Sequence, residues 1–401
     1  MALARDLLVI LVLGVAGPRH ADADPVCPYN TKSCYCFSQS MVCTDLQELP
    51  PLATGSNILN VTDLTFQDGN IRTISGNNSL PPNLITVSFT SHPLTNISID
   101  AFQGSSTTLK HLTISHAQFT RLPAALVKLR DLNHFNMDHT YIQDWDTATF
   151  ENSTATLTNL ALVSVGLTEW PTWFSLFRSL QVVDVSNNSL KTIPDNAFSF
   201  VTNTLLHLSL TDCNLTQVPK TLSQLKNLTS LDLSGNTLTN INGRPAIEQI
   251  GMFPLAKTLV ILQIKNSGLK VIPNFANLTK LSRINLDYNQ ITNSTSGSFS
   301  KSVTSLDLGE NNLPAVPTVV AGMNNLTFLD LSYNNIRSVN FDTLPLPLDM
   351  VDLSGNNLTQ INDTTTKELA ELTYLYLYKN HITSIPYLKA WRRSAHWIWN
   401  Q

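Results

Sequence analysis

The chain has 401 residues, of which 42% are hydrophobic and 13% are charged, and its formal net charge is −4. This charge gives no reason to expect nucleic acid or an anionic membrane as a partner, because binding to either depends on clustered Lys and Arg. The length would accommodate two or three ordinary globular domains. An internal repeat could instead extend one core along the whole chain.

The first residues have the pattern of a secretory signal peptide. Arg5 precedes the apolar run 7–17, and the small-residue site Ala21–Asp22–Ala23 follows it. Cleavage is therefore predicted after Ala23. The alternative, a membrane anchor, would need about 20 apolar residues, and the run is shorter. No later segment of spanning length follows, so we expect a secreted, extracellular protein.

Four of the five cysteines lie close together, at Cys27, Cys34, Cys36 and Cys43. In a secretory protein this cluster predicts two disulfides. A zinc site is the alternative, but paired zinc ligands usually have two or more residues between them, and Cys34 and Cys36 have one. Four cysteines allow three connectivities, and spacing alone does not choose among them.

An eleven-residue pattern recurs through the rest of the chain and is clearest at 326–336, LTFLDLSYNNI. Alternating apolar residues predict a short strand, which is followed by an asparagine and another aliphatic residue. Fourteen copies begin at Val61, Leu84, Leu109, Leu132, Leu157, Leu180, Leu205, Leu228, Leu259, Leu281, Val303, Leu326, Leu348 and Leu372.

This pattern resembles that of the leucine-rich-repeat family, and the cysteine cluster resembles the N-terminal cap of its extracellular members. The loop between Cys27 and Cys34 is longer than in many such caps. The resemblance implies an α/β fold, a horseshoe-shaped solenoid with a parallel β-sheet on the concave side and mostly irregular convex segments. It also implies the disulfides Cys27–Cys36 and Cys34–Cys43.

The expected organisation has four parts. Residues 1–23 are the signal peptide, 24–57 the cysteine-rich cap and 58–386 the repeats, while 387–401 form a C-terminal tail. The tail lacks the cysteine cluster that often closes proteins of this family. It is either an improvised cap over the last repeat or the end of a shortened chain, and the sequence leaves both open.

Two further features of the repeats carry predictions. Cys213 occupies the position that asparagine holds in seven other copies, so a buried free thiol is predicted there, with a redox or intermolecular cysteine as the alternative. The interval between Leu228 and Leu259 is longer than the others. We interpret it as a tolerated surface insertion, and a ligand loop is the alternative.

No catalytic motif is found in the sequence. Ser223-x-x-Lys226 fits a hydrolase fragment by letters alone, and the spacing of Leu222, Leu225 and Leu228 explains it as core packing. We therefore predict that the protein is not an enzyme, and no cofactor is expected.

Outward strand positions in the C-terminal half combine acidic and aromatic residues. Exposed aromatic side chains are enriched where proteins bind partners. We therefore predict a surface for a protein, peptide or glycan ligand, formed by Tyr288, Asp307, Phe328, Asp330, Tyr333, Asp352, Tyr374, Tyr376 and Tyr378.

Histidines recur at equivalent positions of the third and fourth repeats. His111 aligns with His134, and His116 with His139, near Asp138. Side chains at equivalent positions of paired strands lie within about 5 Å. A solvated polar face is the simpler interpretation, and a patch that senses acid pH or binds metal is the alternative.

Sequons are dense, and each is a candidate glycosylation site in a secreted protein. They lie at Asn60, Asn77, Asn96, Asn152, Asn187, Asn214, Asn227, Asn277, Asn293, Asn325, Asn357 and Asn362.

Together these features predict a secreted, non-catalytic recognition protein that binds its ligand through the concave face. The alternative is the truncated ectodomain of a membrane leucine-rich-repeat receptor, with or without a cytoplasmic kinase. Fold-level resemblance does not identify a ligand or an oligomeric state.

Overall fold

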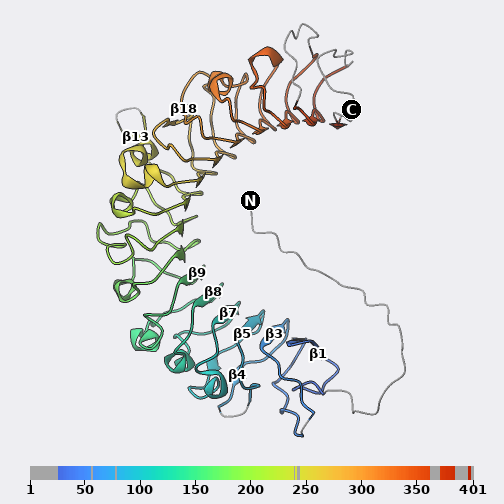
Figure 1. Cartoon of the computed structure of the whole chain (residues 1–401), viewed down its shortest axis with the longest axis vertical. Coiled ribbons are helices and arrows are strands. Elements are labelled where there is room, and N and C mark those ends of the chain that lie inside the picture. The colour runs from blue at the N-terminus through green and yellow to red at the C-terminus, as the bar shows by residue number, and fades with distance from the viewer. Residues whose placement is uncertain are drawn as a thin grey trace.

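The computed structural model describes residues 26–55, 57–76, 79–238, 240–241, 244–361, 371–383 and 396–398. These residues form an open horseshoe, with the strands on its inner side and the connecting segments on its outer side (Figure 1). The fold class predicted from the repeats is confirmed. Within the described part of the chain, no helix has the length and apolar character needed to cross a bilayer.

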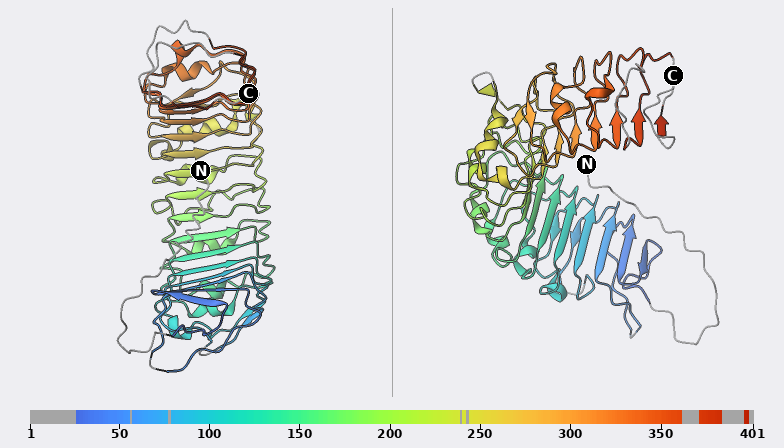
Figure 2. Two further views of the ribbon diagram at one scale, coloured as in Figure 1. Left: turned by 90° about the vertical axis from the view of Figure 1, so that its right-hand side faces the viewer. Right: turned by 45° about the horizontal axis from the view of Figure 1, so that its top comes forward.

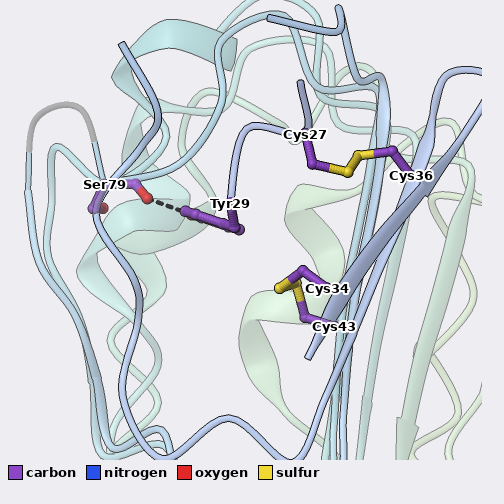
Figure 3. Close-up of a disulfide and its surroundings, with 6 residues drawn as sticks. All are labelled: Cys27, Tyr29, Cys34, Cys36, Cys43 and Ser79. Carbon is purple, nitrogen blue, oxygen red and sulfur yellow. Dashed lines mark hydrogen bonds between the residues drawn. A yellow bond between two sulfur atoms is a disulfide. The ribbon is translucent and has the colours of Figure 1, made fainter. Parts of the chain in front are cut away.

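The cysteine cluster builds one end of the horseshoe. Strands β1 (Cys34–Phe37) and β2 (Ser40–Thr44) pair in antiparallel. The disulfides Cys27–Cys36 and Cys34–Cys43, the pairs implied by the resemblance, join this hairpin to the preceding loop and to itself (Figure 3). Tyr29 is fully buried beside them, and its hydroxyl donates a hydrogen bond to the carbonyl oxygen of Ser79. The cap thereby covers the apolar edge of the first repeat.

The concave sheet has seventeen strands among the described residues, and only β1 is antiparallel to its neighbour (Figure 2). Fourteen strands come from the fourteen predicted repeats, β1 and β2 come from the cap, and β23 comes from the tail after 386. After β2 the parallel strands are β3 (Asp63–Gln67), β5 (Thr86–Thr90), β7 (His111–Ser115), β8 (His134–Asp138), β9 (Asn159–Val163), β10 (Val182–Asp184), β11 (His207–Ser209), β12 (Ser230–Asp232), β15 (Ile261–Gln263), β17 (Arg283–Asn285), β19 (Ser305–Asp307), β20 (Phe328–Asp330), β21 (Met350–Asp352), β22 (Tyr374–Tyr376) and β23 (His396–Ile398).

Register is constant along the sheet, so equivalent residues of successive repeats are direct neighbours. Phe328, Leu329 and Asp330 of β20, for example, pair with Met350, Val351 and Asp352 of β21. Leu329 is fully buried, whereas its two flanking side chains are half-buried on the concave face. This alternation is the period of two that every strand imposes on its side chains.

Buried asparagines form a ladder behind the C-terminal part of the sheet. The Asn236 amide donates to the carbonyls of Leu210 and Leu233, and its Oδ1 accepts from the main-chain N–H of Cys213 and Leu215. Each such side chain therefore joins two repeats through backbone groups that would otherwise be unpaired in the core. The same arrangement recurs at Asn188, Asn289, Asn311, Asn334, Asn356 and Asn380.

Strand length changes where this ladder begins. In the concave sheet, the strands from β3 to β9 have five residues each, and those from β10 to β22 have three. Asn188, the first asparagine of the ladder, follows β10, and its amide donates to the carbonyl of Val185, the residue that directly follows the strand. The amide thus bonds to main-chain groups directly after the three-residue strand. In the repeats with five-residue strands, pairing with the neighbouring strand continues at this point.

The convex side contains short 3-10 helices and two-stranded pairs, so it is more regular than the sequence suggested. Pro123, Pro171, Pro219 and Pro317 immediately precede four of these helices, where the fixed φ of proline suits an extended entry. The helices are η1 (Gln103–Ser105), η2 (Ala124–Lys128), η3 (Thr147–Phe150), η4 (Thr172–Leu176), η5 (Lys220–Gln224), η6 (Ala246–Met252), η7 (Pro254–Lys257), η8 (Thr318–Gly322) and η9 (Phe341–Thr343). The pairs are β4 (Thr73–Ile74) with β6 (Asn96–Ile97), β13 (Asn240–Ile241) with β14 (Arg244–Pro245), and β16 (Asn274–Phe275) with β18 (Ser298–Phe299).

The long interval between β12 and β15 lies on this convex side. It supplies the β13–β14 pair and then helices η6 and η7, visible in yellow on the outer side of the horseshoe (Figure 1). Ile247, Ile250 and Leu255 of this segment are fully buried. The extra residues therefore contribute to the core as well as to the surface.

Candidate functional site

Where the chain leaves the sheet, one residue of the cap and one of each repeat has a left-handed backbone conformation. Its N–H donates to the carbonyl of the next repeat, as His116 does to Asp138 at 3.0 Å and Tyr288 to Gly309 at 3.1 Å. We call this row of residues the ridge, because its non-glycine side chains are exposed or half-buried along one edge of the concave face. The ridge consists of Asp45, Asp68, Ser91, His116, His139, Ser164, Asn187, Asp212, Gly235, Asn266, Tyr288, Glu310, Tyr333, Gly355 and Lys379, all with positive φ.

The predicted C-terminal residues lie on one continuous concave surface. Asp307, Asp330 and Asp352 are adjacent in register, and Tyr376 continues their row. We call the set the acidic–aromatic surface, and its members are Tyr288, Asp307, Phe328, Asp330, Tyr333, Asp352, Tyr374, Tyr376 and Tyr378. Apart from Tyr288, which is 57% exposed, these side chains are half-buried.

A parallel row of apolar side chains runs beside the aspartates. Phe328, Met350 and Tyr374 are adjacent in register, one strand after another. Sequence reasoning missed Met350. An apolar residue at an outward strand position indicates a candidate ligand contact, so the sequence could have revealed it. The row supplies contact area next to the carboxylates, and Met350 belongs with the candidate ligand contacts.

The aspartates of this surface are poorly solvated. Burial, together with the neighbouring charges of Asp287 and Asp330, raises the pKa of Asp307 to about 7. Burial also raises the pKa of Asp287 and of Asp352. A cationic group placed here would therefore relieve the mutual repulsion of the carboxylates.

Lysines of the chain already contact the two ridge tyrosines. Lys265 Nζ lies 5.8 Å from the ring centre of Tyr288, and Lys379 Nζ lies 5.0 Å from that of Tyr333. Lys379 also donates to the Tyr333 hydroxyl at 2.9 Å. The Tyr333 ring lies across Gly355, since a Cβ there would be 2.6 Å from its Cδ1 atom. Both rings thus present a face that accommodates a cation.

The four predicted histidines do not form a single site. The ring centres of His111 and His134 are 4.3 Å apart at the start of β7 and β8, and those of His116 and His139 are 4.5 Å apart on the ridge beyond the strand ends. His134 Nδ1 is buried without a hydrogen-bond partner in the described structure. Its pKa is lowered, first by burial and then by His111.

A carboxylate, that of Asp138, lies beside the ridge pair His116 and His139. Asp138 Oδ1 lies 3.0 Å from His139 Nδ1 and 3.8 Å from His116 Nδ1. The hydroxyl of Ser115 contacts both His116 Nδ1 and Asp138 Oδ1. Sequence reasoning missed Ser115, whose position facing Asp138 follows from the β7–β8 register.

Cys213 is a fully buried free cysteine behind the sheet. Its thiol donates to the carbonyl of Val185 at 3.3 Å, and burial raises its pKa to about 12. The prediction of a buried free thiol at this position is confirmed.

Ten of the twelve sequon asparagines fall in the described structure, and the side chains of all ten are exposed. Asn187 lies on the ridge, so a glycan there would cover part of the concave edge. Asn77 and Asn362 lie outside the described residues, as do the predicted signal peptide and most of the tail after 386.

These features define a class of protein: a disulfide-capped solenoid of parallel strands whose variable side chains lie on a concave face. A family model described as leucine rich repeat matches residues 279–336, and a second with the same description matches 179–200 and 227–245. Fibromodulin of Sus scrofa is 32% identical over 106 residues, which cover 26% of this chain and 71% of that sequence. The chain belongs to the leucine-rich-repeat family, in its extracellular type with a cysteine-rich cap.

Other similarities are narrower or concern the fold alone. Human oligodendrocyte-myelin glycoprotein is 41% identical over 81 residues, which cover 20% of this chain and 18% of that protein. A leucine-rich-repeat protein of Leptospira interrogans superimposes with a TM-score of 0.62 at 22% identity, covering 84% of this chain and 90% of that one. Toll in the Drosophila Toll–Spatzle complex gives a TM-score of 0.53 at 20% identity, covering 80% and 50%.

The relatives of this chain are non-enzymatic leucine-rich-repeat proteins, in agreement with the prediction from the sequence. They support a non-catalytic ligand-binding role.

Proposed function

We propose that the protein is secreted and recognises a protein or peptide ligand through the acidic–aromatic surface. The observation that carries this proposal is the in-register row of Asp307, Asp330 and Asp352 beside the apolar row of Phe328, Met350 and Tyr374. The half-buried carboxylates would be stabilised by a cationic partner. The aromatic rings beside them supply apolar area whose burial favours binding.

The charge of this surface favours a ligand segment that carries Lys or Arg. Such a side chain could approach the carboxylate row and also lie over the ring of Tyr288 or Tyr333. Toll, whose solved complex with Spatzle shares this fold, provides a precedent for a protein ligand. A glycan remains the alternative ligand class, since aromatic rings also stack on sugars.

A second candidate function is the ectodomain of a membrane receptor. The similarity in fold to Toll favours it. Sequencing the transcript beyond the codon for Gln401 separates the two functions. A continuing frame that encodes about 20 apolar residues supports the receptor, and a stop codon supports the secreted protein.

Alanine substitution tests the proposed surface. The wild-type chain, the double variant Tyr333→Ala/Tyr376→Ala and the control Tyr35→Ala would each be immobilised and exposed to conditioned extracellular medium. Tyr35 is a suitable control because it is 59% exposed in the cap, far from β20 to β22. We expect the wild type and Tyr35→Ala to capture the same protein and the double variant to lose it. Equal capture by all three contradicts the proposed surface.

A further inference from the structure

Two ridge histidines and one aspartate converge on the concave edge of the N-terminal half. The side chains of His116, Asp138 and His139 each offer a ligand atom, and these atoms lie within 4.8 Å of one another. Asp138 Oδ1 is the shared partner, at 3.0 Å from His139 Nδ1 and 3.8 Å from His116 Nδ1. The carboxylate oxygen is thus already turned toward both imidazoles.

The backbone holds both histidines in place before any ligand arrives. His116 has a φ of 57° and His139 a φ of 46°, and each N–H donates to the next repeat at 3.0 Å. Because the two residues occupy equivalent positions, their rings are nearly parallel, with an interplanar angle of 7°. The side chains of both are more than half exposed. A dissolved ion can therefore reach their nitrogens without opening the core.

The groups around Asp138 resemble the outer shell of a metal centre. Ser115 Oγ donates to Asp138 Oδ1 at 2.5 Å and lies 2.8 Å from His116 Nδ1. Hydrogen bonds of this kind orient ligating carboxylates and imidazoles. Ser115 is itself buried, so its hydroxyl has a defined position.

We infer that His116, Asp138 and His139 bind a divalent transition-metal ion, of which Zn²⁺ and Cu²⁺ are the best match. Two imidazoles and one carboxylate are ligands that these ions accept, whereas Mg²⁺ prefers sites built from oxygen alone. Tetrahedral zinc requires ligand atoms about 3.3 Å apart, given metal–ligand bonds of about 2.0 Å. Small rotations of the exposed histidine side chains would bring the three ligand atoms to this separation.

This metal site is independent of the acidic–aromatic surface. Strands β7 and β8 lie in the N-terminal arm of the horseshoe, and β20 to β22 lie in the opposite arm (Figure 1). Three protein ligands leave one zinc position open for water or for a ligand atom of a bound molecule. The site would therefore add a metal-dependent contact to the other arm of the concave face.

The test is a metal titration of the full secreted chain, produced without a polyhistidine tag, in chelator-free buffer. Calorimetry with ZnCl₂, and with CuCl₂ in parallel, should show one specific equivalent, and MgCl₂ should give none. The double variant His116→Asn/His139→Asn should lose this binding. Ser115→Ala should weaken it by about 10-fold to 100-fold, as the loss of an outer-shell partner does.

Two controls separate the site from misfolding and from other histidines. Asparagine occurs naturally on the ridge at Asn187 and Asn266, so the double variant should keep the wild-type Tm in the absence of metal. His207→Gln alters an exposed histidine of β11 and should leave binding unchanged. No zinc binding at millimolar concentration, or binding that persists in the double variant, overturns the inference.

Discussion

The Oδ1 atom of Asn236 lies 3.2 Å from the main-chain nitrogen of Cys213, the residue at the same position one repeat earlier. The hydrogen bond joins two repeats through a side chain that is itself fully buried. Contacts of this kind recur along the ladder, so a line of hydrogen-bonded polar side chains runs through the buried part of the solenoid.

Replacing Asn236 with alanine should destabilise the protein by about 3 kcal/mol. The change leaves the N–H groups of Cys213 and Leu215 without their acceptor, and unpaired buried polar groups cost about 1–3 kcal/mol each. Urea denaturation followed by circular dichroism measures the loss. The exposed Asn324→Ala serves as control and should change stability by less than about 0.5 kcal/mol. Equal midpoints for the two variants would show that the ladder contributes no stability.

Cys213 should be unreactive in the folded protein. Burial raises its pKa to about 12, and the thiolate is the form that attacks disulfide reagents. Ellman's reagent at pH 8 should therefore detect no thiol in the native protein and one thiol per chain in guanidinium chloride without reductant. Rapid labelling of the native protein would contradict this prediction.

Stability should fall as the pH drops below about 6.5 because of His92. This side chain is 1% exposed, its Nε2 has no hydrogen-bond partner in the described structure, and burial lowers its pKa. The unfolded chain then binds a proton at a pH where the folded chain does not, so stability decreases from pH 6.5 down to the folded pKa.

The variant His92→Asn tests this cause. Asparagine is the usual residue at this position of the repeat, as at Asn236, and it does not titrate. The decrease in Tm between pH 7 and pH 5 should be smaller in this variant than in the wild type, and His207→Gln should match the wild type. If the two variants lose the same Tm on acidification, His92 is not responsible.

Asp307→Asn should stabilise the free protein at neutral pH. The folded pKa of Asp307 is about 7 and its ordinary value is 3.8, so the folded chain retains a proton that the unfolded chain has lost. Stability therefore decreases as the pH rises from about 4 to 7. At pH 7.5 the amide should add on the order of 2 kcal/mol, and at pH 3.5 it should add almost nothing.

Thermal unfolding across this pH range provides the measurement for Asp307. Asp349→Asn is the matched control, because Asp349 is exposed directly before β21. A gain in Tm that does not depend on pH would mean that the substitution acts by packing. The loss of the Asp307 carboxylate should also weaken the binding of a cationic ligand. The same substitution would therefore raise stability and lower affinity.

The sequence predicts most of this fold because each repeat has the same alternation of buried apolar and outward-facing residues. Leu329 and Leu331 alternate with Phe328 and Asp330, so which side chains enter the core follows from the strand period alone. Constant spacing then fixes the register, which is why the pairing of His116 with His139 could be expected.

Other features depend on contacts between repeats that no local pattern encodes. The bounds of the 3-10 helices arise from how successive turns pack. The raised pKa of Asp307 depends on burial among neighbouring strands, and the separation of the histidines into two pairs depends on where each strand ends. Strand β23 was missed because its segment lacks the repeat pattern, yet it pairs in register with β22.

The ridge restricts the amino acids available at one edge of the molecule without touching the core. Its fifteen positions hold Asp, Ser, His, Asn, Gly, Tyr, Glu and Lys, and none holds Val, Ile or Thr, whose branched Cβ is disfavoured at positive φ. Successive ridge side chains are spaced by about 4.8 Å, the distance between paired strands. Ridge residues can therefore be substituted one at a time by other polar or aromatic residues, in evolution or by design, while the solenoid fold is kept.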